Sequence, residues 1–402
     1  MALLSVADAL ARVVEGAAPV SAEHVPLNEA EGRVLAEDVM ARRTQPPEDL
    51  SAMDGYAVRA ADIANAPARL TLIGEVAAGR PFAGTVGTGQ AARIFTGGVL
   101  PAGSDTVVIQ ENTAREGDVV VVNTPASVGK NVRPAGLDFA QGHVGLREGR
   151  RLTGRDVALA AAMNHATLSV RRRPKIAIVA TGDELVPPGT EPGPGQIVYS
   201  NVFALAAVAR REGADVIDLG ILPDRLEETI AGVRRARELG ADVLVTAGGA
   251  SVGDYDLVQP ALAAEGLALS FWKVAVRPGK PLLSGALGAM RVLGLPGNPV
   301  SAYVCSVLFL VPLIRSLSGR SDVSLPVSRG VLGSDLKAND ERADYLRATL
   351  TLRDGMPVAT PFALQDSSML VPLAAADCLV IREPHAPPAA AGSPCLFVKL
   401  ED

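Results

Sequence analysis

The chain has 402 residues, of which 48% are hydrophobic and 20% charged, and its formal net charge is −6. The length exceeds what one hydrophobic core usually supports, and the composition excludes a disordered chain, so about two to four packed domains are expected. The acidic balance excludes a broadly basic surface and argues against nucleic acid as the main partner.

The first half of the chain predicts two short helices and a small β domain. Apolar side chains recur at helical spacing over residues 5–16, where Ser5 and Asp8 form a capping pattern, and a second helix is expected over 155–164. Between residues 68 and 122 short apolar runs alternate with Gly-rich breaks, which is typical of an all-β sandwich or barrel. We therefore expect a helical linker domain (1–22, 43–50 and 136–172) that carries an inserted β domain (23–42 and 51–135).

From Lys175 onward, β-type apolar runs alternate with helical patterns. The runs are 175–180, 215–219, 242–246, 269–276 and 291–295, and the helices are 201–212, 224–238, 256–264 and 299–317. This alternation predicts a three-layer α/β domain with a parallel sheet over residues 173–320. Short strands return over 321–402 and predict a small C-terminal β-barrel-like domain, so the expected fold class is multidomain, α/β plus all-β.

Ligands of an open parallel sheet bind beyond the carboxyl ends of its strands, and the distinctive sequences of this chain lie there. Gly lets the backbone approach a ligand, and a helix N-terminus offers free N–H groups. Lys273, Arg277 and Lys280 add positive charge. We therefore expect this edge to bind an anion through five loops, which are 181–184, 223–224, 248–256, 277–281 and 296–301.

Three carboxylates at the same edge, Glu184, Asp224 and Asp256, could hold a hard divalent ion that bridges to phosphate oxygens. Asp224 begins an Asp-Arg-Leu-Glu capping pattern and could equally cap a helix, and Asp256 could be a helix N-terminal acid. Glu184 has no evident capping role. The residues thus favour a metal-assisted reaction of the phosphoryl-transfer kind.

Other kinds of site are not indicated. The four His residues lie outside every Gly-rich loop of the sheet edge, which argues against Ser-His or Cys-His catalysis, and the chain has no P-loop. The three Cys residues, 305, 378 and 395, lack the spacing of a disulfide framework or zinc site. Because the N-terminus lacks a signal pattern and no apolar run reaches about 18 residues, a cytoplasmic protein without a membrane segment is expected.

Six motifs occur in an order that resembles one family, molybdopterin molybdenumtransferase (MoeA and the gephyrin E domain). The resemblance covers almost the whole chain. The motifs are Met53-Asp-Gly-Tyr-Ala57, Thr96-Gly97 with Pro101-x-Gly103, Thr181-Gly-Asp-Glu-Leu185, Gly248-Gly-x-Ser-Val-Gly253, Arg277-Pro-Gly-Lys-Pro281 and Gly294-Leu-Pro-Gly-Asn-Pro-Val-Ser301.

The resemblance implies a cytoplasmic homodimer of four-domain protomers that inserts molybdate into adenylylated molybdopterin, with Mg²⁺ assistance and release of AMP. It also implies that the N-terminal β domain of one protomer faces the sheet edge of the other, and that molybdopterin adenylyltransferase and molybdoenzyme maturation proteins are partners. From the acidic charge and the apolar pattern, neither nucleic acid nor a membrane is expected as a partner. By match to the motifs, the catalytic residues are Asp54, Thr96, Glu184, Asp224 and Asp256. Of these, Glu184, Asp224 and Asp256 are also expected to hold the metal, and Asp138 is a further functional position.

The same matches give a set of expected substrate-binding residues. Arg347 and Ser367 are similar to family positions associated with oxyanion binding. The full set is Thr181, Gly182, Gly248, Gly249, Ser251, Gly253, Lys273, Arg277, Gly279, Lys280, Pro296, Gly297, Asn298, Ser301, Arg347 and Ser367.

The sequence departs from the family pattern at Leu137, Tyr199, Ala250 and Asp366. Asp366 replaces a Gly next to Ser367, and a carboxylate there should weaken oxyanion binding by like-charge repulsion. Two alternatives stay open. One is molybdopterin adenylyltransferase, whose fold residues 175–318 resemble, although its usual Gly-Gly-Thr-Gly is Gly248-Gly-Ala-Ser here; the other is a non-catalytic, gephyrin-like scaffold for partner peptides.

Overall fold

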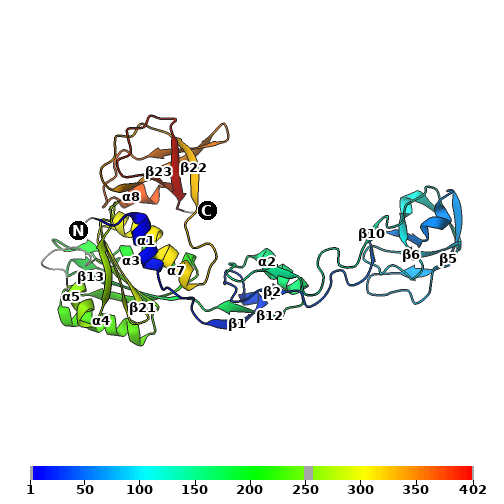
Figure 1. Ribbon diagram of the computed structural model, residues 1–402, viewed down its shortest axis with the longest axis horizontal. Helices are drawn as coiled ribbons and strands as arrows, with labels where there is room; N and C mark the ends of the chain where they lie inside the picture. Colours follow the sequence, from blue (N-terminus) through cyan, green and yellow to red (C-terminus); the bar gives the residue numbers. More distant parts are fainter. Residues whose placement is uncertain (1–2, 249–256, 401–402) are drawn as a thin grey trace.

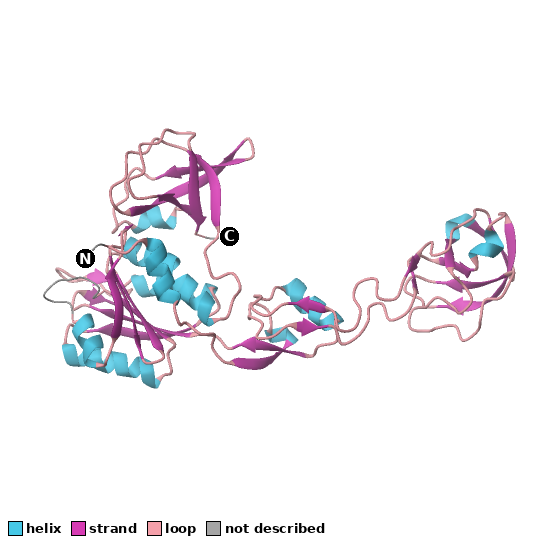
Figure 2. Ribbon diagram, in the orientation of Figure 1, coloured by secondary structure: helices cyan, strands magenta, loops and turns pink. Residues whose placement is uncertain are grey.

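The computed structural model describes residues 3–248 and 257–400 and shows an elongated molecule (Figure 1). The α/β domain and the C-terminal β domain lie next to each other at one end, and the N-terminal β domain lies at the other (Figure 2). A small body containing β1 (Ala22–Pro26), β12 (Thr167–Arg171) and α2 (Gly154–Ala162) stands between them. The N-terminal β domain is therefore remote from the α/β sheet of its own chain.

The first helix, α1 (Val6–Val14), begins as predicted at Ser5, whose hydroxyl accepts a hydrogen bond from the Asp8 N–H at 3.0 Å. Its buried residues, Ala9 and Val13, belong to the core of the α/β domain. The helix therefore packs on the α/β domain instead of forming part of the linker domain.

The middle body joins two distant parts of the sequence. β1 pairs antiparallel with β12, and β2 (Val39–Met40) pairs with β11 (Val144–Leu146). Its core combines Leu35 with Met163, both almost fully buried. Residues 23–42, grouped above with the inserted β domain, lie instead with 139–170, because their apolar side chains are buried against β11, α2 and β12.

The N-terminal β domain has the short strands that its alternating sequence predicts. A six-stranded sheet has the order β7-β4-β6-β5-β9-β8, and a strand pair, β3 with β10, adjoins it. On β9 buried and half-buried Val residues alternate, as expected where one face of a strand lies on a core. The strands are β3 (Leu50–Ser51), β4 (Gly55–Val58), β5 (Ala68–Val76), β6 (Gln90–Ile94), β7 (Thr106–Ile109), β8 (Thr113–Glu116), β9 (Val119–Val122) and β10 (Val132–Arg133).

The α/β domain contains a six-stranded sheet of order β16-β13-β17-β21-β20-β18. Its strands are β13 (Lys175–Thr181), β16 (Asp215–Leu222), β17 (Val243–Ala247), β18 (Ala268–Lys273), β20 (Pro281–Leu287) and β21 (Met290–Leu295). β20 is antiparallel to both neighbours, while the others point the same way. The predicted parallel sheet is therefore mixed, because a tight hairpin with Gly288 at φ 64° returns the chain into β21.

Helices cover both faces of this sheet, as predicted. One face packs against α1, α3 (Asn201–Arg211), α6 (Pro299–Cys305) and α7 (Val311–Leu317), and the other packs against α4 (Leu226–Glu238) and α5 (Val258–Ala264). A π-helical turn, Ser306–Leu310, joins α6 to α7 into one helix. That helix is long and apolar enough to cross a membrane. However, 83% of its apolar stretch is buried inside the protein, so it is the core helix of this domain.

The C-terminal domain is a closed β structure with one strand borrowed from the α/β domain. Its sheet has the order β19-β23-β24-β22-β26-β25, and pairing of β23 with β25 closes it. The predicted strand 369–373 is instead the short helix α8 (Leu370–Ala374), whose first turn accommodates Pro372. The strands are β19 (Val276–Arg277), β22 (Val327–Leu332), β23 (Ala343–Arg353), β24 (Met356–Pro361), β25 (Cys378–Arg382) and β26 (Pro394–Lys399).

Candidate active site at the sheet edge

A cavity of about 630 Å³ opens beyond the carboxyl ends of β13, β17 and β21. Because these strands point the same way, their following loops meet at one edge, as the sequence predicts. The cavity also reaches the C-terminal domain at Ser368. The lining residues are Ala180, Thr181, Glu184, Leu185, Ile197, Val198, Tyr199, Ser200, Asn201, Ala247, Gly248, Pro281, Pro296, Gly297, Asn298, Pro299 and Ser368.

Two glycines hold the loops close to the cavity. Gly182 has φ 150°, and a Cβ there would lie 2.5 Å from a carboxylate oxygen of Glu184. Gly279 has φ 118°, and a Cβ there would lie 2.3 Å from the Cys305 Sγ on α6. Any other residue would displace Glu184 or lift the 277–280 loop away from the helix.

Side-chain amides tie the cavity wall together. Asn201, at the start of α3, donates to the Gly297 carbonyl at 2.7 Å. Asn298 donates to the Ser367 hydroxyl at 2.9 Å, and the Val300 N–H donates to the Ser367 carbonyl at 3.0 Å. The α6 end of the sheet edge is thereby joined to the C-terminal domain. Ser301 is buried one turn further along α6 and does not line the cavity.

Two carboxylates gather beside Glu184. The Asp224 N–H donates to Asp183 Oδ1 at 3.1 Å. Burial, followed by repulsion from Asp183 and Glu184, raises the pKa of Asp224. Helix α4 begins at Leu226 after an Arg225 N-cap, so Asp224 does not cap it. Asp183 was not singled out from the sequence, although it lies inside the Thr181–Leu185 motif.

Part of the expected site lies outside the described residues, namely Gly249, Ala250, Ser251, Gly253 and Asp256. Over residues 3–248 and 257–400 no group of three His, Cys, Asp or Glu side chains is close enough to hold a metal ion. The three-carboxylate metal site predicted from Glu184, Asp224 and Asp256 therefore stays a prediction.

Two lysines stand exposed at the rim of the edge. Lys273 is the last residue of β18, and Lys280 lies immediately before β20, the strand that pairs with β18. The Lys280 carbonyl accepts a hydrogen bond from the Val274 N–H at 3.0 Å. Neither ammonium group has an ion pair within the described part of the chain. Both are therefore free to meet an anion.

Arg277, the third predicted cation, is engaged by the C-terminal domain. Its Nε and one terminal nitrogen donate to the two carboxylate oxygens of Asp344, both at 2.6 Å, and it also contacts Asp340 and Asn339. The hydrogen bonds to Asp344 raise the pKa of Arg277. This side chain fastens the 276–281 loop to β23.

Arg347 is 1% exposed and holds the 362–369 loop. Its guanidinium donates to the carbonyls of Met369 and Asp366, each at 2.9 Å, and to Gln365. The Asp366 carboxylate accepts hydrogen bonds from the Ser368 N–H and hydroxyl, which lower the pKa of Asp366. Contact of Arg347 and Ser367 with an oxyanion stays a prediction, but the loop that carries Ser367 and Ser368 depends on Arg347.

Tyr199, where the family pattern has Asp, lines the cavity but is 6% exposed. Its hydroxyl donates to Asp218 Oδ1 at 3.3 Å, and its ring meets Phe203 edge-on. Burial, followed by Asp218, raises the pKa of Tyr199. The cavity wall is therefore neutral at this position.

The N-terminal β domain carries the other two predicted catalytic residues. Asp54 Oδ1 accepts hydrogen bonds from the Thr96 N–H and hydroxyl, both at 2.8 Å, and these bonds lower the pKa of Asp54. The N-terminal β domain that carries this pair lies far from the α/β domain of the same chain (Figure 1). Asp138 is exposed in the connection between that domain and the middle body. The chain thus brings together the sheet-edge residues but not Asp54, Thr96 or Asp138.

Comparison with known proteins gives one consistent result. Residues 4–164 match the model "MoeA N-terminal region (domain I and II)", residues 177–316 match "Probable molybdopterin binding domain", and residues 329–400 match "MoeA C-terminal region (domain IV)". These three matches follow one another over nearly the whole chain.

Relatives and solved structures agree with these models. Molybdopterin molybdenumtransferase from Nostoc sp. is 40% identical over 83% of this chain and 78% of its own length, and that from Haemophilus influenzae is 34% identical over 91% and 90%. The crystal structure of a molybdopterin biosynthesis MoeA protein from Pyrococcus horikoshii superposes with a TM-score of 0.86 at 30% identity and covers 100% of both chains.

Proposed function

The chain belongs to the MoeA family, and we propose that it is a molybdopterin molybdenumtransferase that inserts molybdate into adenylylated molybdopterin, with Mg²⁺ assistance and release of AMP. The observation that carries this proposal is the sheet-edge cavity, which is lined by Gly248, Gly297 and the Glu184 carboxylate, while Lys273 and Lys280 lie exposed at the same edge of the sheet. Its volume of about 630 Å³ suits a substrate of nucleotide-conjugate size.

The chemistry of the donors fits each part of that substrate. Lys273 and Lys280 would neutralise phosphate charge at the rim, and the exposed turn at Gly297 and Asn298 would let phosphate or pterin atoms approach the backbone. Asn201 fixes that turn through its 2.7 Å bond to Gly297. These groups position the substrate and favour charge on its leaving phosphate.

Mg²⁺ suits the carboxylates beside the cavity. Glu184 and Asp224 would offer oxygen ligands, and a divalent cation would relieve the burial of Asp224 and the repulsion from Asp183 and Glu184 that raise the pKa of Asp224. When bound, the ion would stabilise negative charge on phosphate oxygens. Asp256 would complete the ligand set inferred from the family.

We further propose that the enzyme works as a homodimer in the cytoplasm. Asp54 accepts two hydrogen bonds from Thr96 in a domain that lies far from the α/β domain of its own chain, as expected if both residues serve the cavity of a partner. The three free cysteines suit a reducing compartment. A molybdopterin adenylyltransferase is the expected donor of the substrate.

The activity is tested by incubating the purified chain with adenylylated molybdopterin, Mg²⁺ and molybdate and measuring AMP by chromatography. AMP release that requires both molybdate and Mg²⁺ is expected, and parallel reactions with tungstate measure oxyanion preference. Absence of molybdate-dependent AMP would refute the proposal.

The shared site is tested separately by mixing subunits. Asp54→Ala and Glu184→Ala homodimers are each expected to be inactive. In a refolded equal mixture, half of the dimers are mixed and each mixed dimer keeps one intact site, so about a quarter of wild-type activity should return. If the mixture stays inactive although mixed dimers form, Asp54 and Glu184 act in the same chain.

A further inference from the structure

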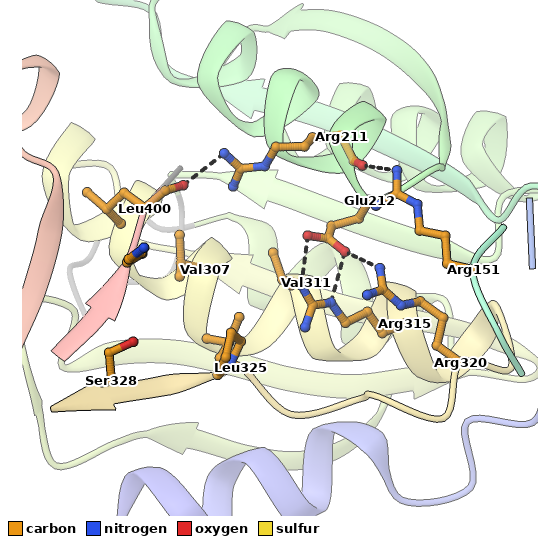
Figure 3. A pocket seen from close by; sticks show the side chains of 12 residues that line it. Arg151, Arg211, Glu212, Val307, Val311, Arg315, Arg320, Leu325, Ser328 and Leu400 are labelled. Carbon is orange, nitrogen blue, oxygen red and sulfur yellow. Dashed lines mark hydrogen bonds and ion pairs between the residues drawn. The ribbon is translucent and has the colours of Figure 1, made fainter. Parts of the chain in front are cut away.

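A second cavity, of about 600 Å³, lies where three parts of the chain meet (Figure 3). The middle body contributes Arg151, the α/β domain contributes the end of α3 and the helix containing α7, and the C-terminal domain contributes the segment before β22 and the end of β26. Its lining residues are Arg151, Arg211, Glu212, Val307, Val311, Arg315, Arg320, Leu325, Pro326, Ser328, Lys399 and Leu400.

Positive charge dominates this lining. Four Arg and one Lys face a single carboxylate, Glu212, although the chain as a whole carries a net charge of −6. Glu212 accepts hydrogen bonds from Arg315 at 2.9 and 3.1 Å and from Arg320 at 2.8 Å. Arg320 is also paired with Asp322, so these two arginines are compensated.

The other three cations form no ion pair with any residue that the structure describes. Arg151 donates to the Arg211 carbonyl at 2.8 Å, and Arg211 donates to the Leu400 carbonyl at 2.9 Å, which aligns both guanidinium groups along one wall (Figure 3). Across residues 3–248 and 257–400, no carboxylate pairs with Arg151, Arg211 or Lys399. Burial, followed by repulsion from Arg320, lowers the pKa of Arg151. Among the described residues, this wall therefore has no ion-paired carboxylate of its own, and the charges nearest to Arg151 include the paired Glu212 and Asp322.

A different wall of the cavity is apolar. Val307 and Val311 project from consecutive turns of the core helix, and Leu325 faces them from the segment that leads into the C-terminal domain. An occupant that satisfies both walls needs a compact anionic group and an apolar body. Inorganic ions supply only the first, and 600 Å³ is far more than one such ion fills.

We propose that this cavity binds a small organic phosphate, whose phosphate group lies against Arg151, Arg211 and Lys399 and whose apolar part lies against Val307, Val311 and Leu325. A dianionic phosphate matches several cations that approach from different directions, and planar guanidinium groups suit its oxygens. The three cations come from three parts of the chain, so a bound phosphate would link those parts.

The cavity also has a direct connection to the sheet edge. Helix α3 begins at Asn201, which lines the first cavity, and ends at Arg211, which lines the second, about 15 Å further along the helix axis. A ligand that fixes Arg211 therefore acts on the same rigid element that holds the Gly297 turn. The ligand should also raise the melting temperature, because it binds the folded chain.

The test uses phenyl phosphate, which combines a dianion with an apolar ring, and inorganic phosphate as the comparison, by isothermal titration calorimetry on the full chain. The informative variant is Arg211→Gln/Lys399→Gln, whose two residues are exposed and outside every ion pair of the described chain. The matched control is Arg210→Gln/Lys337→Gln, which removes the same charges from exposed positions away from the cavity.

Wild type and control are expected to bind phenyl phosphate more tightly than inorganic phosphate, and the informative variant should bind it about 100-fold more weakly. Equal affinity of the informative and control variants would overturn the proposal, because binding would then occur elsewhere, for example at Lys273 and Lys280. The proposal is also overturned if wild type does not bind phenyl phosphate or prefers inorganic phosphate.

Discussion

Two cationic regions adjoin each other at the sheet edge and use their charges differently. At the rim, Lys273 and Lys280 are exposed and have no ion pair among residues 3–248 and 257–400. At the seam with the C-terminal domain, Arg277 and Arg347 donate to carboxylates, carbonyls and an amide of their own chain. The presence of a cationic residue in a motif therefore does not show that it contacts a ligand. Its hydrogen-bond and ion-pair partners within the chain must be known first.

The difference follows from the side-chain chemistry. A guanidinium presents five donors in a rigid plane, so it can saturate several fixed acceptors and join two domains. An ammonium on a flexible stem can stay solvated until an anion arrives. At the sheet edge the two lysines are free for a ligand, whereas Arg277 and Arg347 bind groups of their own chain, and the substitutions below separate the two roles.

The largest effect is expected for Lys280→Ala. If Lys280 faces the developing phosphate charge, as proposed, its removal should lower kcat/KM for AMP release by at least about 100-fold. The melting temperature should change by no more than about 1 °C, because the side chain is exposed and has no partner in the described chain. Lys337→Ala, at an exposed position of the C-terminal domain, is the control and should retain full activity. If the Lys280→Ala variant unfolds, then the lysines at the rim contribute to stability as the arginines at the seam do, and the two regions do not differ in role.

The next effect is on stability. Arg347→Ala would remove the donor to the carbonyls of Asp366 and Met369 and leave a cavity in place of a side chain that is almost fully buried, so the free energy of unfolding should fall by about 3 kcal/mol. Urea denaturation measures this, and Arg353→Ala, at the exposed end of the same strand, should change it by less than about 0.5 kcal/mol. A stable but inactive Arg347→Ala protein would instead assign this arginine to the substrate.

Arg277→Gln should give a smaller loss of stability, about 2 kcal/mol, because Arg277 is partly exposed while Asp344 is left nearly buried without its partner. A double-mutant cycle with Asp344→Asn isolates the pair, and a coupling energy of about 1–2 kcal/mol is expected. Additive effects would show that Arg277 does not fasten the two domains.

The sequence predicts much of this site because its parts are local. Gly182 and Gly248 follow directly after strands, and Gly297 follows another strand after one intervening residue. The apolar composition of these strands identifies them, so a rule about strand ends places the three glycines at one edge. Asn201 was missed although it begins a predicted helix, since nothing in the sequence indicates that its amide reaches Gly297.

Long-range pairing is what the sequence does not reveal. Residues 23–42 belong with 139–170 because β1 pairs with β12 more than a hundred residues later, and no local pattern encodes that choice. Likewise, Asp344 forms an ion pair with Arg277 although the two residues lie in different domains. The Arg-lined second cavity has residues as distant as Arg151 and Lys399, so periodicity and motifs cannot find it.

The smallest expected effect concerns Asp224 and tests the carboxylate side of the rim. Its folded-state pKa is raised, so ionising this carboxyl costs stability. That cost is absent below the unfolded pKa of about 4 and is incurred as the pH rises through the raised folded value. Asn does not ionise, so Asp224→Asn in EDTA should melt about 1 °C above wild type at pH 8, and the difference should disappear as the pH falls to the unfolded pKa of about 4.

Mg²⁺ should reverse that order. It stabilises the wild type by binding its carboxylates, whereas the Asn variant has lost one ligand, so the wild type should melt higher in Mg²⁺ at pH 8. Glu191→Gln, which removes one charge from an exposed loop near the same edge, should show neither the rise in EDTA nor the reversal. If Mg²⁺ stabilises wild type and Asp224→Asn equally, the ion does not bind Asp224. The free lysines, and not the carboxylates, would then be the groups of this edge that bind the substrate.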